Sequence, residues 1–198
     1  MIITIGRQFG SGGREIGEKL AQRLGYAFYD KEILTMAAEE NGFSAAAMQH
    51  YDEKPSGSLI YSLYMTGAAT SDNLPLNQQL AFAQFNVIRK VAQNDNCVIV
   101  GRCADYILRE KPNLLTVFLH APLADRAKRI MEEKNIDSQS LAEKTVKKTD
   151  KYREDYYNFF THKKWGSAEC ATLSLDTSVL GIDRCVEIIA GTVEMMAE

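Results

Sequence analysis

The first residues with chemical potential are glycines near the start of the chain. Gly6, Gly10, Gly12 and Gly13 fall within eight residues of the stretch "IGRQFGSGGREIG". Glycine lets the backbone adopt positive φ and approach a ligand closely, and consecutive N–H groups then form an anion-binding nest. An apolar, β-branched run precedes the stretch and a helical pattern follows it, which is the order found in phosphate-binding loops. The alternative is a tight strand-to-helix turn that binds nothing.

The loop departs from the usual pattern GxxxxGK[ST] at its charged positions. When Gly12 is aligned with the second glycine, Arg7 stands at the first glycine, Gly13 at the lysine and Arg14 at the Mg²⁺-binding hydroxyl. Arg14 can supply the missing charge, because a guanidinium is always ionised and binds phosphate in a bidentate way. Together with one residue from a later helix, the predicted ATP and phosphate site consists of Arg7, Gly10, Ser11, Gly12, Gly13, Arg14, Glu15 and Arg126.

Arginines matter here because phosphoryl transfer needs positioning and positive charge more than covalent chemistry. Arg102 follows the apolar run "VIVG", at the carboxyl end of a predicted strand, where parallel sheets bind ligands. We predict that Arg102 binds the phosphate of the acceptor, with Asp105 nearby. The alternative is a surface arginine, or one that pairs with Asp105 at the start of a helix.

Two further arginines, Arg126 and Arg129, lie one helical turn apart and therefore share a helix face. One interpretation gives this face a contact with ATP. The other is a solvated face that Glu132 and Glu133 neutralise, and the sequence favours both equally.

A charged stretch, "KTVKKTDKYREDYY", carries Lys and Arg side chains at helical spacing, which favours a helix face that binds a ligand. The residues singled out on this helix are Lys147, Lys148, Asp150 and Arg153, with Asp150 orienting Arg153 through a pair three residues apart. An ordinary charged helix is the alternative. The predicted catalytic cations are then Arg14, Arg102 and Arg153.

Two aspartates end predicted strands. Asp30 can bind hydroxyls or the base of an acceptor, or it can cap the helix that follows. Asp176, together with Thr177 and Ser178, is interpreted as a structural cap of the last helix.

The elements that must position these residues alternate along the chain. Strands are predicted at 2–5, 26–29, 97–101, 114–120 and 171–178, and helices at 14–24, 76–94, 122–135, 140–160 and 179–197. This alternation indicates an α/β fold with a parallel sheet. Residues 30–75 interrupt it and predict a helical insert over the carboxyl edge of the sheet.

Composition narrows the class of protein. The chain has 198 residues, 45% of them apolar, and a net charge of −3, which favours one domain and does not favour a nucleic-acid partner. Its four cysteines form no CxxC pair, and no apolar run is long enough to cross a membrane. We therefore expect a cytoplasmic protein. The sequence does not decide its oligomeric state.

Taken together, several sequence blocks resemble the cytidylate kinase-like family. They are the opening "ITIGRQFGSGGREIGEKLAQRLGYAFYDKEIL", then "VIVGRCADYIL", "KKTDKYREDYYNFF", "WG" and "LSLDTSVLGID". The resemblance implies a P-loop kinase sandwich with a five-stranded parallel sheet of order 2-3-1-4-5. It also implies a core at 1–29, 96–134 and 166–198, a monophosphate-binding insert at 30–75 and a lid at about 135–165.

The same resemblance implies that the γ-phosphoryl group of ATP is transferred to CMP or dCMP with Mg²⁺, and that the lysine-free loop is a family trait. No Mg²⁺ ligand is assigned from the sequence. Two alternatives stay open: a kinase of another small metabolite, and a non-catalytic nucleotide-binding regulatory protein.

Overall fold

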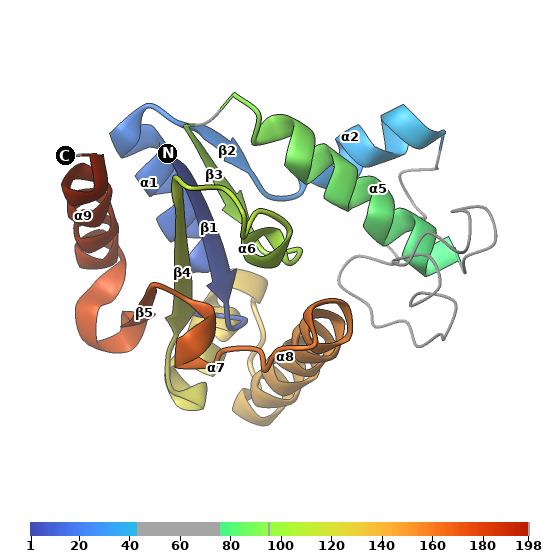
Figure 1. The fold of residues 1–198 in the computed structure, drawn as a ribbon. Coiled ribbons are helices and arrows are strands. Elements are labelled where there is room, and N and C mark those ends of the chain that lie inside the picture. The colour runs from blue at the N-terminus through green and yellow to red at the C-terminus, as the bar shows by residue number, and fades with distance from the viewer. Residues whose placement is uncertain (43–75, 95, 198) are drawn as a thin grey trace.

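The computed structural model describes residues 1–42, 76–94 and 96–197 (Figure 1). In these residues a five-stranded parallel sheet has the order β2-β3-β1-β4-β5, as predicted. Its strands are β1 (Ile2–Arg7), β2 (Ala27–Tyr29), β3 (Cys97–Val100), β4 (Leu114–His120) and β5 (Leu173–Asp176). Because β1 lies between β3 and β4, the glycine loop that follows it emerges at the middle of the carboxyl edge of the sheet.

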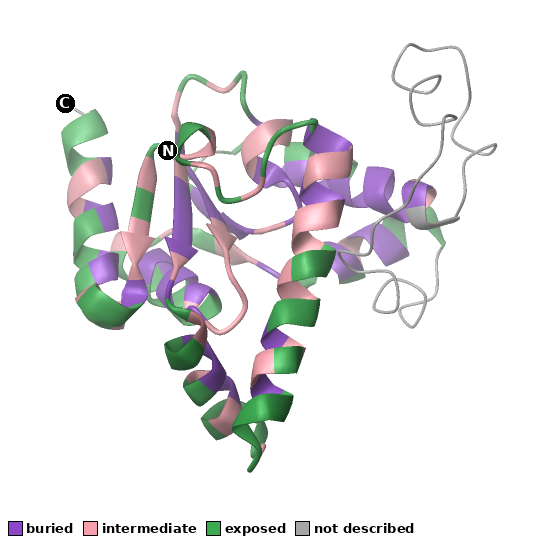
Figure 2. Ribbon diagram, turned by 90° about the horizontal axis from the view of Figure 1, so that it is seen from below, coloured by how far each residue is buried: buried purple, intermediate pink, exposed green. Residues whose placement is uncertain are grey.

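Helices cover both faces of the sheet because successive strand residues point to opposite faces. Ile2 and Ile99 pack with α2 (Glu32–Asn41) and α5 (Leu76–Val91), whereas Ile3 and Ile5 pack with α1 (Gly13–Leu24) and α9 (Thr177–Ala197). The buried residues in Figure 2 accordingly follow the strands and the inner sides of these helices. The result is the three-layer sandwich predicted from the sequence.

A third apolar cluster attaches the charged helix to the rest of the fold. This helix, α8 (Gln139–Thr161), packs beside α7 (Leu123–Lys134). It is capped by Ser138, whose hydroxyl accepts a hydrogen bond from the Leu141 N–H. Its Phe160 ring meets Phe85 of α5 edge-on, with ring centres 5.1 Å apart. The cluster, completed by the short helix α6 (Ala104–Ile107), holds α8 beside the carboxyl edge of the sheet.

Some boundaries differ from the predicted ones. β1 continues past Ile5 to Arg7, because Gly6 and Arg7 still pair with β4. The last helix starts at Thr177 and is interrupted at Gly181, whose φ of 74° and ψ of 169° are not helical. Asp176 caps this helix as predicted, since its carboxylate accepts from the Ser178 N–H at 2.9 Å.

The predicted insert is described only in part. α2 belongs to it and packs on α5, whereas residues 43–75 lie outside the described residues.

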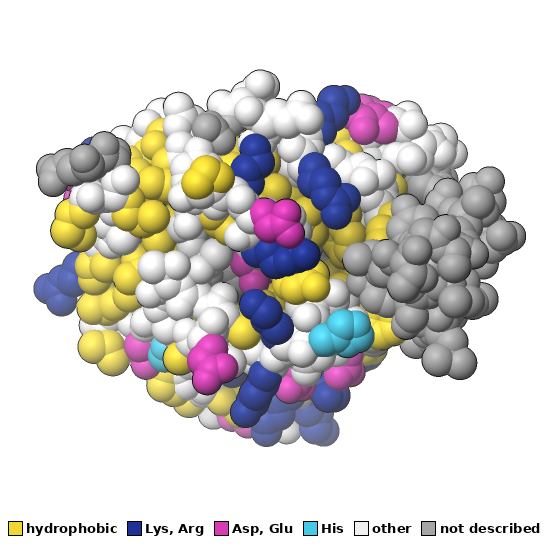
Figure 3. Space-filling view, in the orientation of Figure 1, with side chains coloured by type: hydrophobic (Ala, Val, Ile, Leu, Met, Phe, Trp, Pro, Cys, Tyr) yellow, Lys and Arg dark blue, Asp and Glu magenta, His cyan; other side chains and the backbone are white. Residues whose placement is uncertain are grey.

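A short 3₁₀ turn, η2 (Ala168–Cys170), leads into β5. None of the described helices combines the length and the hydropathy needed to span a bilayer. On the face seen in Figure 3, Lys and Arg side chains lie among Asp and Glu side chains.

Candidate functional site

The glycine loop has the backbone geometry that the sequence predicted. Gly10 and Gly12 have φ of 81° and 78°, in the left-handed region that favours glycine. A Cβ atom at Gly10 would also lie 2.6 Å from the carbonyl oxygen of Arg126. Ser11 is buried and its hydroxyl donates to the Gln8 carbonyl at 2.8 Å, so this hydroxyl stabilises the turn itself.

The loop forms one wall of a cavity of about 440 Å³. The other walls come from the end of β2, the turn after β3, the last turn of α7 and the middle of α8. The three predicted catalytic arginines, Arg14, Arg102 and Arg153, all line it, as do Arg7 and Asp30. Residues from distant parts of the sequence therefore converge on the loop.

Asp30 is the acidic centre of this cavity. It is 5% exposed and accepts from Arg14 and from Arg102, each at 3.2 Å. The alternative that Asp30 caps the next helix is wrong, because α2 begins at Glu32 after Lys31 and has no side-chain cap bond. Instead the Asp30 N–H donates to the Glu32 carboxylate at 2.9 Å.

The net effect of the surroundings is to lower the pKa of Glu32. Burial raises this pKa, but the backbone hydrogen bonds of Glu32 and Asp30, with the charges of Arg14 and Arg102, outweigh the burial. These surroundings therefore favour the anionic form of Glu32.

Arg102 is held in an unusual backbone conformation. Gly101, Arg102 and Cys103 have φ of 77°, 55° and 56°, three successive left-handed residues. A non-glycine residue in this region costs about 1–3 kcal/mol. The Arg102 guanidinium offsets part of this cost through Asp30 and through the Val100 carbonyl at 3.2 Å.

Asp105 does not pair with Arg102, so that structural alternative is wrong. Its carboxylate accepts from the Tyr157 hydroxyl at 2.7 Å, because α8 packs directly over α6 through the aromatic cluster. Burial raises the pKa of Asp105 above its usual range, although the hydrogen bond from Tyr157 lowers it. Asp105 and Tyr157 line a smaller cavity of about 40 Å³, next to Arg102.

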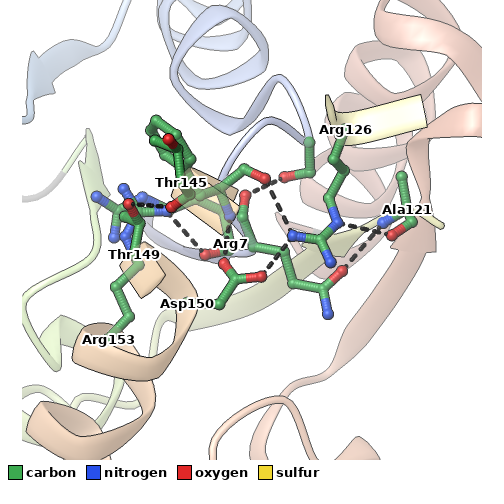
Figure 4. A network of polar contacts seen from close by, with 10 residues as sticks. Arg7, Ala121, Arg126, Thr145, Thr149, Asp150 and Arg153 are labelled. Atoms are coloured by element: carbon green, nitrogen blue, oxygen red, sulfur yellow. Dashed lines mark hydrogen bonds and ion pairs between the residues drawn. The ribbon is translucent and has the colours of Figure 1, made fainter. Parts of the chain in front are cut away.

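Arg126 is buried and does not lie on a solvated helix face. Its Nε donates to the Ala121 carbonyl at 2.8 Å, and its Nη1 donates to the Phe9 carbonyl at 3.1 Å and forms an ion pair with Asp150 (Figure 4). The predicted neutralisation of this face by Glu132 and Glu133 is wrong, since Arg129 pairs with Glu15 at 3.1 Å.

Asp150 joins α8 to the loop. One of its oxygens binds Arg126, and the other accepts from the Phe9 N–H at 2.7 Å. Its predicted partner was Arg153, and this prediction is wrong because the tertiary partners lie closer. Arg153 instead donates to the Arg7 carbonyl at 3.2 Å, again across to the end of β1 (Figure 4).

The remaining lid residues are peripheral. Lys147 and Lys148 are exposed, and the Lys148 ammonium lies 5.8 Å from the centre of the Tyr152 ring. Glu15 is half exposed and pairs with Arg129 and, at 3.4 Å, with Lys19. The alternative of an ordinary charged helix thus fits the outer face of α8, whereas its inner face contacts the loop.

Phe9 is a site residue that the sequence reasoning missed. Its ring lies 5.4 Å from the Arg153 guanidinium and 5.0 Å from the Lys134 ammonium, and both of its backbone polar groups bond to other elements. An aromatic residue inside a glycine-rich loop was the available signal, because the face of such a ring attracts nearby cations.

Comparisons with known proteins identify the family of this chain. Residues 2–179 match the model of the cytidylate kinase-like family. The chain belongs to the cytidylate kinase-like family. The search of curated proteins gave no match. A solved structure of an uncharacterized protein from Eubacterium ventriosum is 29% identical, with a TM-score of 0.72 and 98% of each chain covered.

More distant solved structures share the fold of this cytidylate kinase-like protein. A shikimate kinase from Bacteroides thetaiotaomicron is 14% identical, with a TM-score of 0.57 and 98% of each chain covered. A gluconokinase from Sinorhizobium meliloti is 16% identical with a TM-score of 0.53, covering 99% of this chain and 97% of its own. Family and fold together support a kinase acting on a small molecule.

Proposed function

We propose that the protein transfers the γ-phosphoryl group of ATP to a nucleoside monophosphate, CMP or dCMP. The observation that carries this proposal is the convergence of Arg7, Arg14, Arg102 and Arg153 on one cavity beside a glycine loop. Charge spread over the transferring phosphoryl group needs such a set of fixed cations. The choice of a cytidine monophosphate rests on membership of the cytidylate kinase-like family.

In this proposal the nucleotide phosphates bind at the loop and at the first turn of α1. Backbone N–H groups and the positive end of the helix dipole attract them there. Asp30 holds the guanidiniums of Arg14 and Arg102 on one side of the cavity, and these bind the phosphate of the acceptor. Arg153 approaches from α8, where it stabilises charge between donor and acceptor.

The side chains around the cavity indicate how Mg²⁺ could bind. Position 14 carries an arginine in place of a hydroxyl, and the described residues contain no group of three His, Cys, Asp or Glu side chains suited to a metal ion. The side chains described around the cavity therefore do not form a dedicated Mg²⁺ site. Mg²⁺ commonly binds through substrate phosphates and water, where it neutralises phosphate charge.

A coupled assay of ADP release tests the proposal. With ATP and Mg²⁺, we expect turnover with CMP or dCMP to exceed turnover with UMP, AMP and GMP. Turnover with none of the five would reject a nucleoside monophosphate kinase. In that case, stabilisation of the fold by ATP alone would support the nucleotide-binding regulatory protein instead.

A further inference from the structure

Gly13 is a glycine for a reason other than its backbone. Among the described glycines, Gly10 and Gly12 have positive φ, whereas Gly13 does not, and it is the first residue of α1. A Cβ atom at Gly13 would lie 2.7 Å from Cβ and 2.8 Å from Cγ of Arg7. These distances are shorter than close-packed carbon atoms allow. The arginine stem thus occupies the space that a side chain at position 13 would need.

Arg7 reaches this space because of its register in β1. It pairs with Leu119 of β4 and lies on the same face of the strand as Ile3 and Ile5, which pack against α1. Its stem therefore crosses the first turn of α1, and the residue lines the cavity of about 440 Å³. An arginine here brings positive charge to the same helix end that the loop N–H groups make attractive to anions.

Arg7 and Gly13, which are in contact, depart from GxxxxGK[ST] in complementary ways: one gains a cation where the motif has glycine, and the other has glycine where the motif has a cation. The motif has glycine at the first position and lysine at the seventh, whereas this chain has Arg7 and Gly13. We propose that these positions have exchanged roles. Arg7 supplies from β1 the phosphate-binding charge that a lysine supplies from the helix, and Gly13 leaves room for it. This inference rests on the proposed phosphotransferase function.

Arg14 lies with Asp30 and Arg102, on another side of the cavity from the Arg7 stem. Its guanidinium is bound to Asp30, whose other oxygen holds Arg102, so Arg14 belongs to the side of the cavity where the acceptor is proposed to bind. The structure therefore assigns the role of the missing lysine to Arg7 and not to the arginine adjacent in sequence.

The exchange makes a reciprocal variant possible. R7G together with G13K converts "RQFGSGGR" into "GQFGSGKR", which restores both motif positions. The wild-type protein, both single variants and the double variant form a cycle with two readouts: the melting temperature without ligand, and the affinity for tripolyphosphate and ATP by calorimetry. The additional variant R7M keeps the stem over Gly13 and removes the charge. R89M, on exposed α5 surface, is the matched control.

We expect R7M to remain folded but to bind tripolyphosphate and ATP about tenfold more weakly or worse, the scale of a lost charge-assisted hydrogen bond. G13K alone should melt at a lower temperature, because its stem meets Arg7. The double variant should recover both the melting temperature and most of the affinity. R89M should behave as the wild-type protein.

Two results would overturn the exchange while leaving the proposed function intact: wild-type affinity in R7M, or a double variant whose losses in melting temperature equal the sum of the single losses. A wild-type protein that binds neither ATP nor tripolyphosphate would overturn the proposed function, and the role of Arg7 with it.

Discussion

Asp30 and Arg102 are the residues on which the electrostatics of the cavity depend. The Arg102 side chain is 1% exposed and the Asp30 side chain 8%, so neither charge is well solvated. Asp30→Ala removes the carboxylate that binds both Arg102 and Arg14, and the loss of one partner of a buried ion pair costs about 3–5 kcal/mol. We therefore expect Asp30→Ala to lower the free energy of unfolding by about this amount, as measured by urea titration.

Two controls separate this effect from a general loss of charge. Asp183→Ala removes an exposed partner of Lys19 and should leave the urea midpoint unchanged. Adding Arg102→Met to Asp30→Ala should recover part of the lost stability, because the buried guanidinium that Asp30 binds is then absent as well. A single Asp30→Ala variant as stable as the wild-type protein would contradict the prediction.

The sequence predicted which residues gather, but not how they pair. The placement of Arg14 and Arg102 followed from strand ends that meet at one edge of a parallel sheet, and that of Arg153 followed from the lid that the family resemblance implied. Pairing was predicted from local spacing, which suggested Arg153 as the partner of Asp150. The actual partners of Asp150 are Arg126 and Phe9, the latter 141 residues away, and no local pattern encodes such a contact.

At the scale of elements, the attachment of α8 to the loop depends on Asp150. This carboxylate is the described contact that joins the helix to both the Phe9 N–H and Arg126. We expect Asp150→Ala to increase hydrogen exchange at the Phe9 amide by at least tenfold, and to increase exchange in the part of α8 near the loop, because local opening no longer breaks these bonds. Exchange measured by NMR or mass spectrometry tests this.

Asp155→Ala provides the comparison on the same helix. Asp155 pairs at 2.8 Å with Lys151 on the outer part of α8, so its loss should leave exchange at Phe9 unchanged. Equal protection of the Phe9 amide in Asp150→Ala and the wild-type protein would show that the aromatic cluster and Arg153 are enough to hold α8 against the loop.

Element boundaries were predictable wherever apolar pattern and hydrogen bonding end together. The strand at Leu114–His120 was predicted with its observed limits. β1 was predicted too short because its apolar run stops at Ile5 while its ladder with β4 continues to Arg7. The break at Gly181 was missed since the apolar spacing continues through it, and a glycine inside a helical pattern marks a break only in some helices.

At the scale of the whole molecule, the buried Asp105 makes folding depend on pH. Its raised pKa means that the folded protein holds this proton more tightly than the unfolded chain. The resulting stability is fully present below the unfolded pKa, about 3.9, and is lost as the pH rises through the folded pKa. Asp105→Asn cannot titrate, so its melting temperature minus that of the wild-type protein should increase between about pH 4 and neutrality.

Thermal unfolding of both proteins across this range measures the difference in melting temperature. It also cancels the opposite trend of a carboxyl group whose pKa is lowered, such as Glu32. Tyr157→Phe removes the hydrogen bond that lowers the pKa of Asp105, so it should move the loss to higher pH. A difference between Asp105→Asn and the wild-type protein that stays constant with pH would contradict the assignment.

The left-handed turn at Gly101, Arg102 and Cys103 has a consequence for the evolution of this protein. Two independent requirements restrict the residue type at position 102. The backbone, with φ of 55°, tolerates glycine, asparagine and aspartate best and excludes β-branched residues. The buried Asp30 requires a cation. No residue type satisfies both requirements fully, so position 102 should tolerate substitution less well than the other positions of the cavity.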